Sequence, residues 1–264
     1  MNSEKIVKKQ ARKSLNGNWV QIIAAISAVC VIFITALFFI YAAGTAFNFF
    51  DTDTGELLND LAFLIVLLCA EGVLAFAAPA FNGVLKMCSN VVLTGKTEIT
   101  DLFYYFRDKG RYFRTLLLDV VLIYVYSVLV NVLDVYNYVA SFTEVSLSDG
   151  LFANSAETTL TLMLLLAGVI SIAVKVVVFL LFLYYPLAAY AIDDSRGIGK
   201  YMFGFIPFSF RHFGKSLKLF FSFFAWFLSC FFVVPAIYVL PYYLVSAISS
   251  TRWLIVLDRN RRLI

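Results

Sequence analysis

Charged side chains are scarce in this chain: Asp, Glu, Lys and Arg make up 14% of its 264 residues, against about a quarter in water-soluble domains. Apolar residues reach 62%, and the mean hydropathy is +0.87. This composition excludes an ordinary water-soluble domain, because too few polar side chains are available to face water. It predicts an all-α, polytopic membrane protein that forms a single membrane domain over residues 1–264.

Histidine is nearly absent, since His212 is the only one, and this excludes a multi-histidine metal centre. The four cysteines lie in or at the end of apolar runs, without the spacing of a zinc site: Cys30, Cys69, Cys88 and Cys230. The sequence has no nucleotide-binding loop and gives no local support for a Ser-His-Asp arrangement. Its basic residues are scattered, with a net charge of only +4. We therefore expect no enzymatic activity, no cofactor, no metal and no nucleic-acid partner.

Apolar runs long enough to cross a bilayer follow one another along the chain, since a crossing helix needs about 20 apolar residues. They predict six transmembrane helices, at about residues 19–43, 61–85, 113–139, 160–185, 217–235 and 237–257. Segments at about 101–112 and 194–214 are expected at the cytoplasmic interface, the first as an amphipathic helix with Thr100 as its N-cap. The last two crossings share one run, in which Pro235 and Pro241 favour a break. A single crossing followed by an interfacial segment is the alternative.

The basic residues alternate with the acidic ones from loop to loop. Nineteen of the 21 lysines and arginines fall in the N-terminal segment, in the stretches that follow the second and the fourth predicted helix, and at the C-terminus. All of them lie on one side of the membrane if the last run crosses twice. The stretches after the first and third helices carry acids and no base: Asp51, Asp53, Glu56 and Asp60 in the first, and Asp134, Glu144, Asp149 and Glu157 in the second. Because Lys and Arg in short loops collect on the cytoplasmic side, this asymmetry predicts that both termini are cytoplasmic.

Four ionisable residues in predicted helices or at the end of one stand out, because a charge within the hydrocarbon costs about 2.5 to 3.5 kcal/mol on insertion scales. They are Glu71, Lys86, Asp119 and Lys175. Their depths predict two ion pairs, Glu71 with Lys175 and Lys86 with Asp119. Such pairs have two interpretations: they fix the packing of the helices, or they belong to a polar pathway or ligand site. The first is favoured.

Two cytoplasmic segments resemble each other at an offset of 104 residues. Phe106 to Arg114 and Phe210 to Lys218 share the pattern Phe-Arg-x-x-Gly-basic-x-x-basic. The repeat places six basic residues beside aromatic rings: Arg107, Arg111, Arg114, Arg211, Lys215 and Lys218. We expect them to contact anionic lipid headgroups, while docking of a partner protein is the alternative for the first segment.

Several motifs resemble those of a bacterial family of integral membrane proteins, grouped as a domain of unknown function. The matching stretches are Ala11 to Trp19, Asn82-Gly83, Asp101-Leu102-Phe103 with Phe106, Ser209 to Gly214, Leu219-Phe220, Ser222 to Trp226, and Pro241-Tyr242. The resemblance implies about six helices and a location in the bacterial cell membrane. That family has no assigned activity to carry over, and residues 193–207 depart from its pattern.

These observations favour a non-enzymatic accessory, scaffold or lipid-interacting membrane protein, whose partners are anionic lipids or another membrane protein. The alternative is a small transporter or permease that uses Glu71 and Lys175. A lipid-modifying enzyme is the weakest hypothesis, because few ionisable groups lie near the headgroups.

Overall fold

The computed structural model describes residues 3–46, 60–148, 157–195, 197–230 and 233–261, and within these it is helical, with no strand. The elements are α1 (Ser3–Leu15), α2 (Trp19–Ala46), α3 (Asp60–Thr94), the 3₁₀ helix η1 (Ile99–Phe106), α4 (Lys109–Val132), α5 (Val135–Ser148), α6 (Glu157–Phe179), the π-helix η2 (Leu180–Tyr184), α7 (Tyr185–Ile192), α8 (Ile198–Met202), α9 (Phe205–Ser229) and α10 (Val233–Arg261). The predicted all-α fold class is confirmed.

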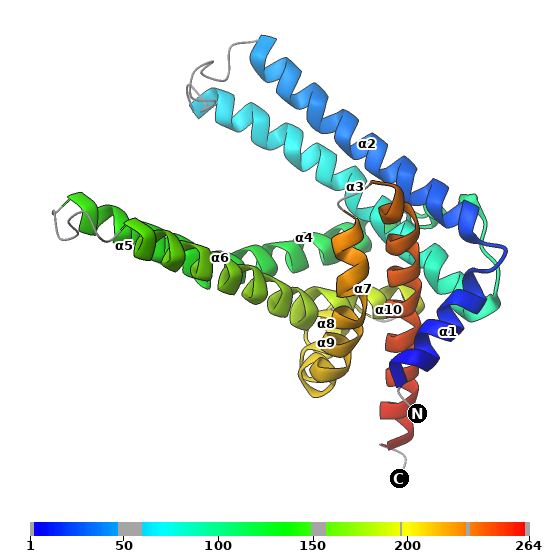
Figure 1. Ribbon diagram of the computed structural model, residues 1–264. Helices are drawn as coiled ribbons and strands as arrows, with labels where there is room; N and C mark the ends of the chain where they lie inside the picture. The colour runs from blue at the N-terminus through cyan, green and yellow to red at the C-terminus, as the bar shows by residue number, and fades with distance from the viewer. Residues whose placement is uncertain (1–2, 47–59, 149–156, 196, 231–232, 262–264) are drawn as a thin grey trace.

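The helices form two long arms on a shared base (Figure 1). One arm is the hairpin of α2 and α3, and the other consists of α4 and α5 running against α6. The arms diverge from the base, which contains α1, η1, α7, α9 and α10 and holds both ends of the chain. The C-terminal ends of α2 and α5 therefore lie far from the base.

Four helical stretches in the described part are long and apolar enough to cross a bilayer: Trp19–Thr45, Lys109–Ser141, Leu162–Ile192 and Pro235–Arg259. The count of six crossings stays a prediction. α9 is 25 residues long, but Arg211, Lys215 and Lys218 lie within it, and its longest uncharged stretch is its last eleven residues. At 1.5 Å per residue those eleven span about 16 Å, roughly half of the hydrocarbon layer.

The last hairpin turns earlier than predicted. α9 ends at Ser229 and α10 begins at Val233, so Pro235 is the third residue of α10 rather than the end of a helix. Proline is tolerated in the first helical turn, where its missing N–H has no helical partner. Pro241 also lies inside the continuous α10.

The two segments of the predicted repeat have different structures. The first covers the end of η1 and the start of α4, where Asp108 accepts hydrogen bonds from the backbone N–H groups of Gly110 and Arg111, both at 3.3 Å. The second lies entirely within α9, with Gly214 in mid-helix. The resemblance between the two segments is therefore one of sequence and does not extend to their structure. The predicted cap Thr100 is wrong, because it lies inside η1.

The N-terminal helix α1 was not predicted. Val7, Ala11 and Leu15 are buried at a spacing of four residues and pack α1 onto the base. Lys8 adds a hydrogen bond of 2.6 Å from its Nζ to the backbone oxygen of Ser222. The spacing of these three small apolar residues in a polar segment was the available signal.

Two glycine turns meet beside α1. Gly17 follows α1 with φ +85° and Gly95 follows α3 with φ +80°, a backbone region that favours glycine. Asn18 joins the turns, since its Nδ2 donates to the Gly95 oxygen at 2.9 Å and its Oδ1 accepts from the Thr97 N–H at 3.2 Å. The entrance to α2 is thus attached to the exit from α3.

Aromatic side chains fill the core of the base, and the largest fully buried ones are Tyr105, Tyr185, Tyr190, Tyr201 and Phe223. α6, η2 and α7 form one continuous helix, with the wide π turn directly before Pro186. Proline cannot donate to the preceding turn and its ring crowds that turn, so the widened ladder accommodates it.

Candidate functional site

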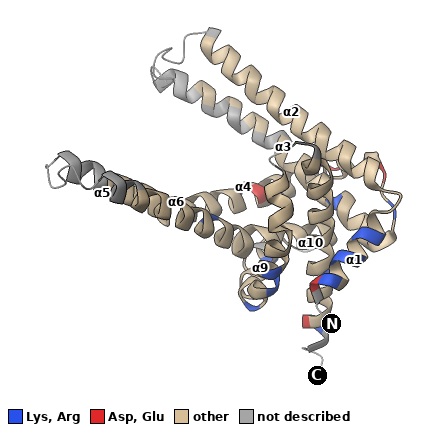
Figure 2. Ribbon diagram, viewed as in Figure 1, with Lys and Arg blue, Asp and Glu red and all other residues tan. Residues whose placement is uncertain are grey.

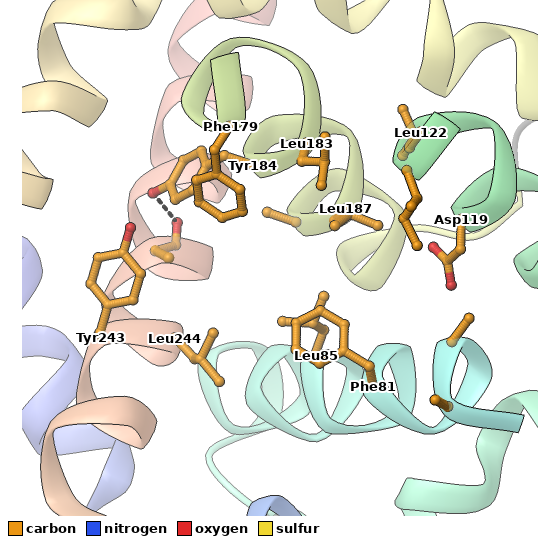
Figure 3. Close-up of a pocket in the computed structure, with 15 residues that line it drawn as sticks. Phe81, Leu85, Asp119, Leu122, Phe179, Leu183, Tyr184, Leu187, Tyr243 and Leu244 are labelled. Atoms are coloured by element: carbon orange, nitrogen blue, oxygen red, sulfur yellow. Dashed lines mark hydrogen bonds between the residues drawn. The ribbon is translucent and has the colours of Figure 1, made fainter. Parts of the chain in front are cut away.

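A cavity of about 330 Å³ lies where the two arms join the base. Its walls come from α3, α4, the continuous helix α6–η2–α7, and α10 (Figure 3). Leu85, Leu183 and Leu187 are among the apolar side chains along its length, and Tyr184 and Tyr243 lie toward one end. Asp119 lies at the opposite end and is the only Asp, Glu, Lys or Arg of the lining.

Helical spacing and small residues produce this space. Phe179, Leu183 and Leu187 recur every four residues through η2, so they line one side of the same helix. Opposite them, α3 and α10 supply small side chains such as Ala78 and Ala247. Larger residues at those positions would fill the gap between the helices. The cavity is therefore encoded by the pattern of small residues as well as by the apolar runs.

Asp119 contacts one polar side chain of α3. The Nδ2 of Asn82 donates both to Asp119 Oδ2 and to the backbone oxygen of Ala78, the latter at 3.2 Å. Asp119 is 4% exposed and Asn82 is fully buried. Asp119 Oδ1 and Asn82 Oδ1 are buried and receive no hydrogen bond from the described residues. Two acceptor oxygens thus lack donors beside an apolar cavity, an arrangement that requires an explanation.

The predicted pair of Lys86 with Asp119 is wrong. Lys86 lies one turn beyond Asn82 on α3, next to the base, and its Nζ is 3.9 Å from Asp194 Oδ1. It also lies 4.8 Å from the centre of the Tyr104 ring. Arg114 donates to the backbone oxygen of Asp194 at 3.2 Å. Lys86 therefore attaches α3 to the end of α7, and Asp119 is left to Asn82.

Lys175 also has a partner that was not predicted. Its Nζ is 3.5 Å from Asp134 Oδ2, at the junction of α4 and α5. Ser171 donates to Asp134 Oδ1 at 2.5 Å, and Asn137 donates to Oδ2 at 3.3 Å. The side chain of Glu71 lies outside the described residues, while the α3 backbone that carries it belongs to the other arm (Figure 1). Asp134 lies inside the apolar run 113–139, and this position could have identified it as a carboxylate that needs a partner.

The six basic residues expected at lipid headgroups are largely engaged with the protein. Arg111 lies 3.5 Å from Asp108 and 4.6 Å from the Tyr104 ring centre, and Arg211 lies 2.7 Å from Asp258. Contacts of the others are Arg107 with the Thr100 oxygen, Arg114 with the Asp194 oxygen, and Lys215 with the Trp253 ring. Lys218 is exposed. Figure 2 shows further basic residues on α1, beside those of α9.

The described residues contain no group of three or more His, Cys, Asp or Glu side chains that is arranged to hold a metal ion. His212 is buried at 4% exposure, with its ring 4.7 Å from that of Phe208. Comparisons of the chain with protein-family models, curated proteins and solved structures give no match. The family resemblance of the sequence therefore stays a prediction.

Proposed function

We propose that this chain is a non-enzymatic integral membrane protein that binds a lipid or a related amphiphile within the bilayer. The observation that carries the proposal is the cavity between α3, α4, η2–α7 and α10. Its volume of about 330 Å³ falls within the range of small-molecule sites, about 300 to 1,000 Å³. Its lining is hydrocarbon except for a few polar atoms, which suits an acyl chain.

The environment proposed for this activity is a bacterial cell membrane, with both termini on the cytoplasmic side. The base would then lie at the cytoplasmic interface. Support comes from α1, whose exposed residues include Lys5, Lys9, Arg12 and Lys13 while its opposite face packs on the protein. Basic side chains near an anionic leaflet contribute about 1 kcal/mol each. Anionic lipids are therefore the partners proposed for the base, and another membrane protein is the alternative partner.

No observation favours the transporter hypothesis over lipid binding. It needed Glu71 and Lys175 to face each other, and Lys175 instead lies against Asp134 on its own arm. An enzymatic role likewise lacks support, because the only titratable side chains that line the cavity are Asp119 and two tyrosines.

Filling the cavity tests the proposal. Ala77 is half-buried and lines the cavity, so Ala77→Phe should occupy the space. Ala43→Phe is the matched control, since Ala43 is exposed on α2. Both variants and the wild type would be purified in a mild detergent and their bound amphiphiles identified by native mass spectrometry. We expect the wild type and Ala43→Phe to retain a non-covalently bound amphiphile and Ala77→Phe to lose it.

Thermal unfolding of the three proteins separates loss of the ligand from loss of the fold. Equal retention by a folded Ala77→Phe variant would overturn the proposal. A wild type that carries no amphiphile, even after incubation with lipid, would overturn it as well.

A further inference from the structure

The cavity has two chemically different ends. Asp119 marks one end, and the tyrosines Tyr184 and Tyr243 lie toward the other, with aliphatic and aromatic side chains between them (Figure 3). Tyr184 uses its hydroxyl to donate to the backbone oxygen of Ala247 at 3.3 Å, so it is satisfied within the protein. The Tyr243 hydroxyl is the other polar group at that end, and the one carboxylate of the lining, Asp119, lies at the opposite end.

At the Asp119 end, two hydrogen-bond acceptor oxygens have no donor among the described residues. Asn82 supplies one N–H to Asp119 Oδ2, and the remaining oxygens, Asp119 Oδ1 and Asn82 Oδ1, receive nothing from the described residues. None of the ion pairs among the described residues involves Asp119, and Lys86, one turn away on α3, is directed to Asp194. The ligand that complements this end carries N–H donors and a positive charge.

The depth of Asp119 limits the size of that ligand. Asp119 is ten residues into α4, about 15 Å from the start of that helix at 1.5 Å per residue. A bulky phosphate-containing headgroup would have to leave the interface to reach this depth. A single ammonium group on one apolar chain reaches it at a smaller cost, because its charge is neutralised by the carboxylate on arrival.

We propose that the cavity is a site for lipophilic amines, in which the ammonium group binds Asp119 and the chain lies along the leucine and phenylalanine side chains toward Tyr184. This rests on the proposed function, since it specifies the headgroup of the amphiphile that the cavity accepts. Asp119 is the charge-recognition residue of the site, and Asn82 holds its carboxylate in place by donating to Oδ2.

Binding of two probes with the same chain and different heads tests the proposal. The full-length protein in phosphatidylcholine nanodiscs would be dialysed against radiolabelled dodecylamine or dodecanol, and the uptake of empty nanodiscs subtracted. Zwitterionic lipid is chosen so that the bilayer does not itself concentrate the amine. We expect saturable binding of both probes, with dodecylamine bound at least tenfold more tightly.

Asp119→Asn keeps the shape of the side chain and removes the charge. It should reduce dodecylamine affinity at least tenfold and leave dodecanol binding within twofold. Asp134→Asn is the matched control, because Asp134 is a second carboxylate inside a membrane helix but has Lys175 as its partner. It should change neither affinity, and thermal unfolding would establish that both variants are folded.

The outcomes distinguish this inference from the proposed function. Equal binding of amine and alcohol by the wild type, or unchanged amine binding by a folded Asp119→Asn, would overturn the amine site and leave an apolar lipid site; Asp119 would then serve helix packing alone. Absence of saturable binding for both probes would overturn the proposed function itself. Loss of amine binding in the Asp134→Asn control would show that Asp119 is not the specific recognition residue, and would overturn the amine site as proposed.

Discussion

Replacing Gly83 with alanine should separate η1 from α3. η1 packs along α3 at the base, and a Cβ added at Gly83 would lie 2.0 Å from the backbone oxygen of Leu102. That carbonyl would have to retreat by about 1.4 Å to reach the 3.4 Å at which ordinary contact begins. It cannot retreat freely, because Asp101 next to it accepts hydrogen bonds from Asn90 at 3.0 Å and Thr97 at 3.1 Å.

Overpacking of a well-packed site costs about 1 to 3 kcal/mol, so we expect the unfolding temperature of Gly83→Ala to fall by about 4 to 8 °C for a loss near 2 kcal/mol. Thermal unfolding in a mild detergent, followed by circular dichroism, measures it. Gly72→Ala is the control on the same helix, where an added Cβ meets nothing within 4 Å; it should be neutral or slightly stabilising. If Gly83→Ala unfolds at the wild-type temperature, η1 does not approach α3 as described.

Two further predictions concern the arms and the orientation of the chain. Lys175→Leu should lower the unfolding temperature by removing the ionic partner of Asp134, which keeps its hydrogen bonds from Ser171 and Asn137. A double-mutant cycle should show larger coupling of Lys175 to Asp134 than to Glu71; the reverse order would restore the pair expected from the sequence. In a cysteine-free background, an impermeant maleimide applied to intact cells should label Thr45→Cys, at the far end of α2, and not Lys9→Cys on α1. Labelling of Lys9→Cys would invert the orientation.

The apolar runs predicted the long helices well, because burial of the backbone in lipid leaves few alternatives to a helix. The expected helix 19–43 corresponds to α2 (Trp19–Ala46), and 160–185 corresponds to the continuous helix α6–η2–α7, which runs seven residues further, to Ile192. The start of α9 was missed by twelve residues. Its first half carries Arg211, Lys215 and Lys218, and a hydropathy argument stops at such charges although a helix does not.

The ion pairs were predicted poorly for a physical reason. Residue spacing along a helix gives the depth of a side chain but not its direction around the helix, nor the divergence of the arms. Glu71 and Lys175 have similar expected depths and belong to different arms (Figure 1). Asp134 was assigned to an outer loop by its charge, whereas α4 and α5 continue as helix on both sides of it. Charge alone therefore identified which residues need partners, and the packing of the helices decided which partners they have.

Of the two polar residues at the candidate site, Asp119 was predicted from the sequence and Asn82 was not. Asp119 was identified because a carboxylate in hydrocarbon is costly, but Asn82 carries no charge and does not interrupt the apolar run around it. The single donor that Asn82 supplies cannot satisfy a carboxylate, which accepts about four hydrogen bonds. A residue retained only to fix helix packing would be better matched, as Asp134 is by Ser171, Asn137 and Lys175. The contrast between these two carboxylates of the same arm supports the proposal that Asp134 serves helix packing and that Asp119, beside the cavity, binds a ligand.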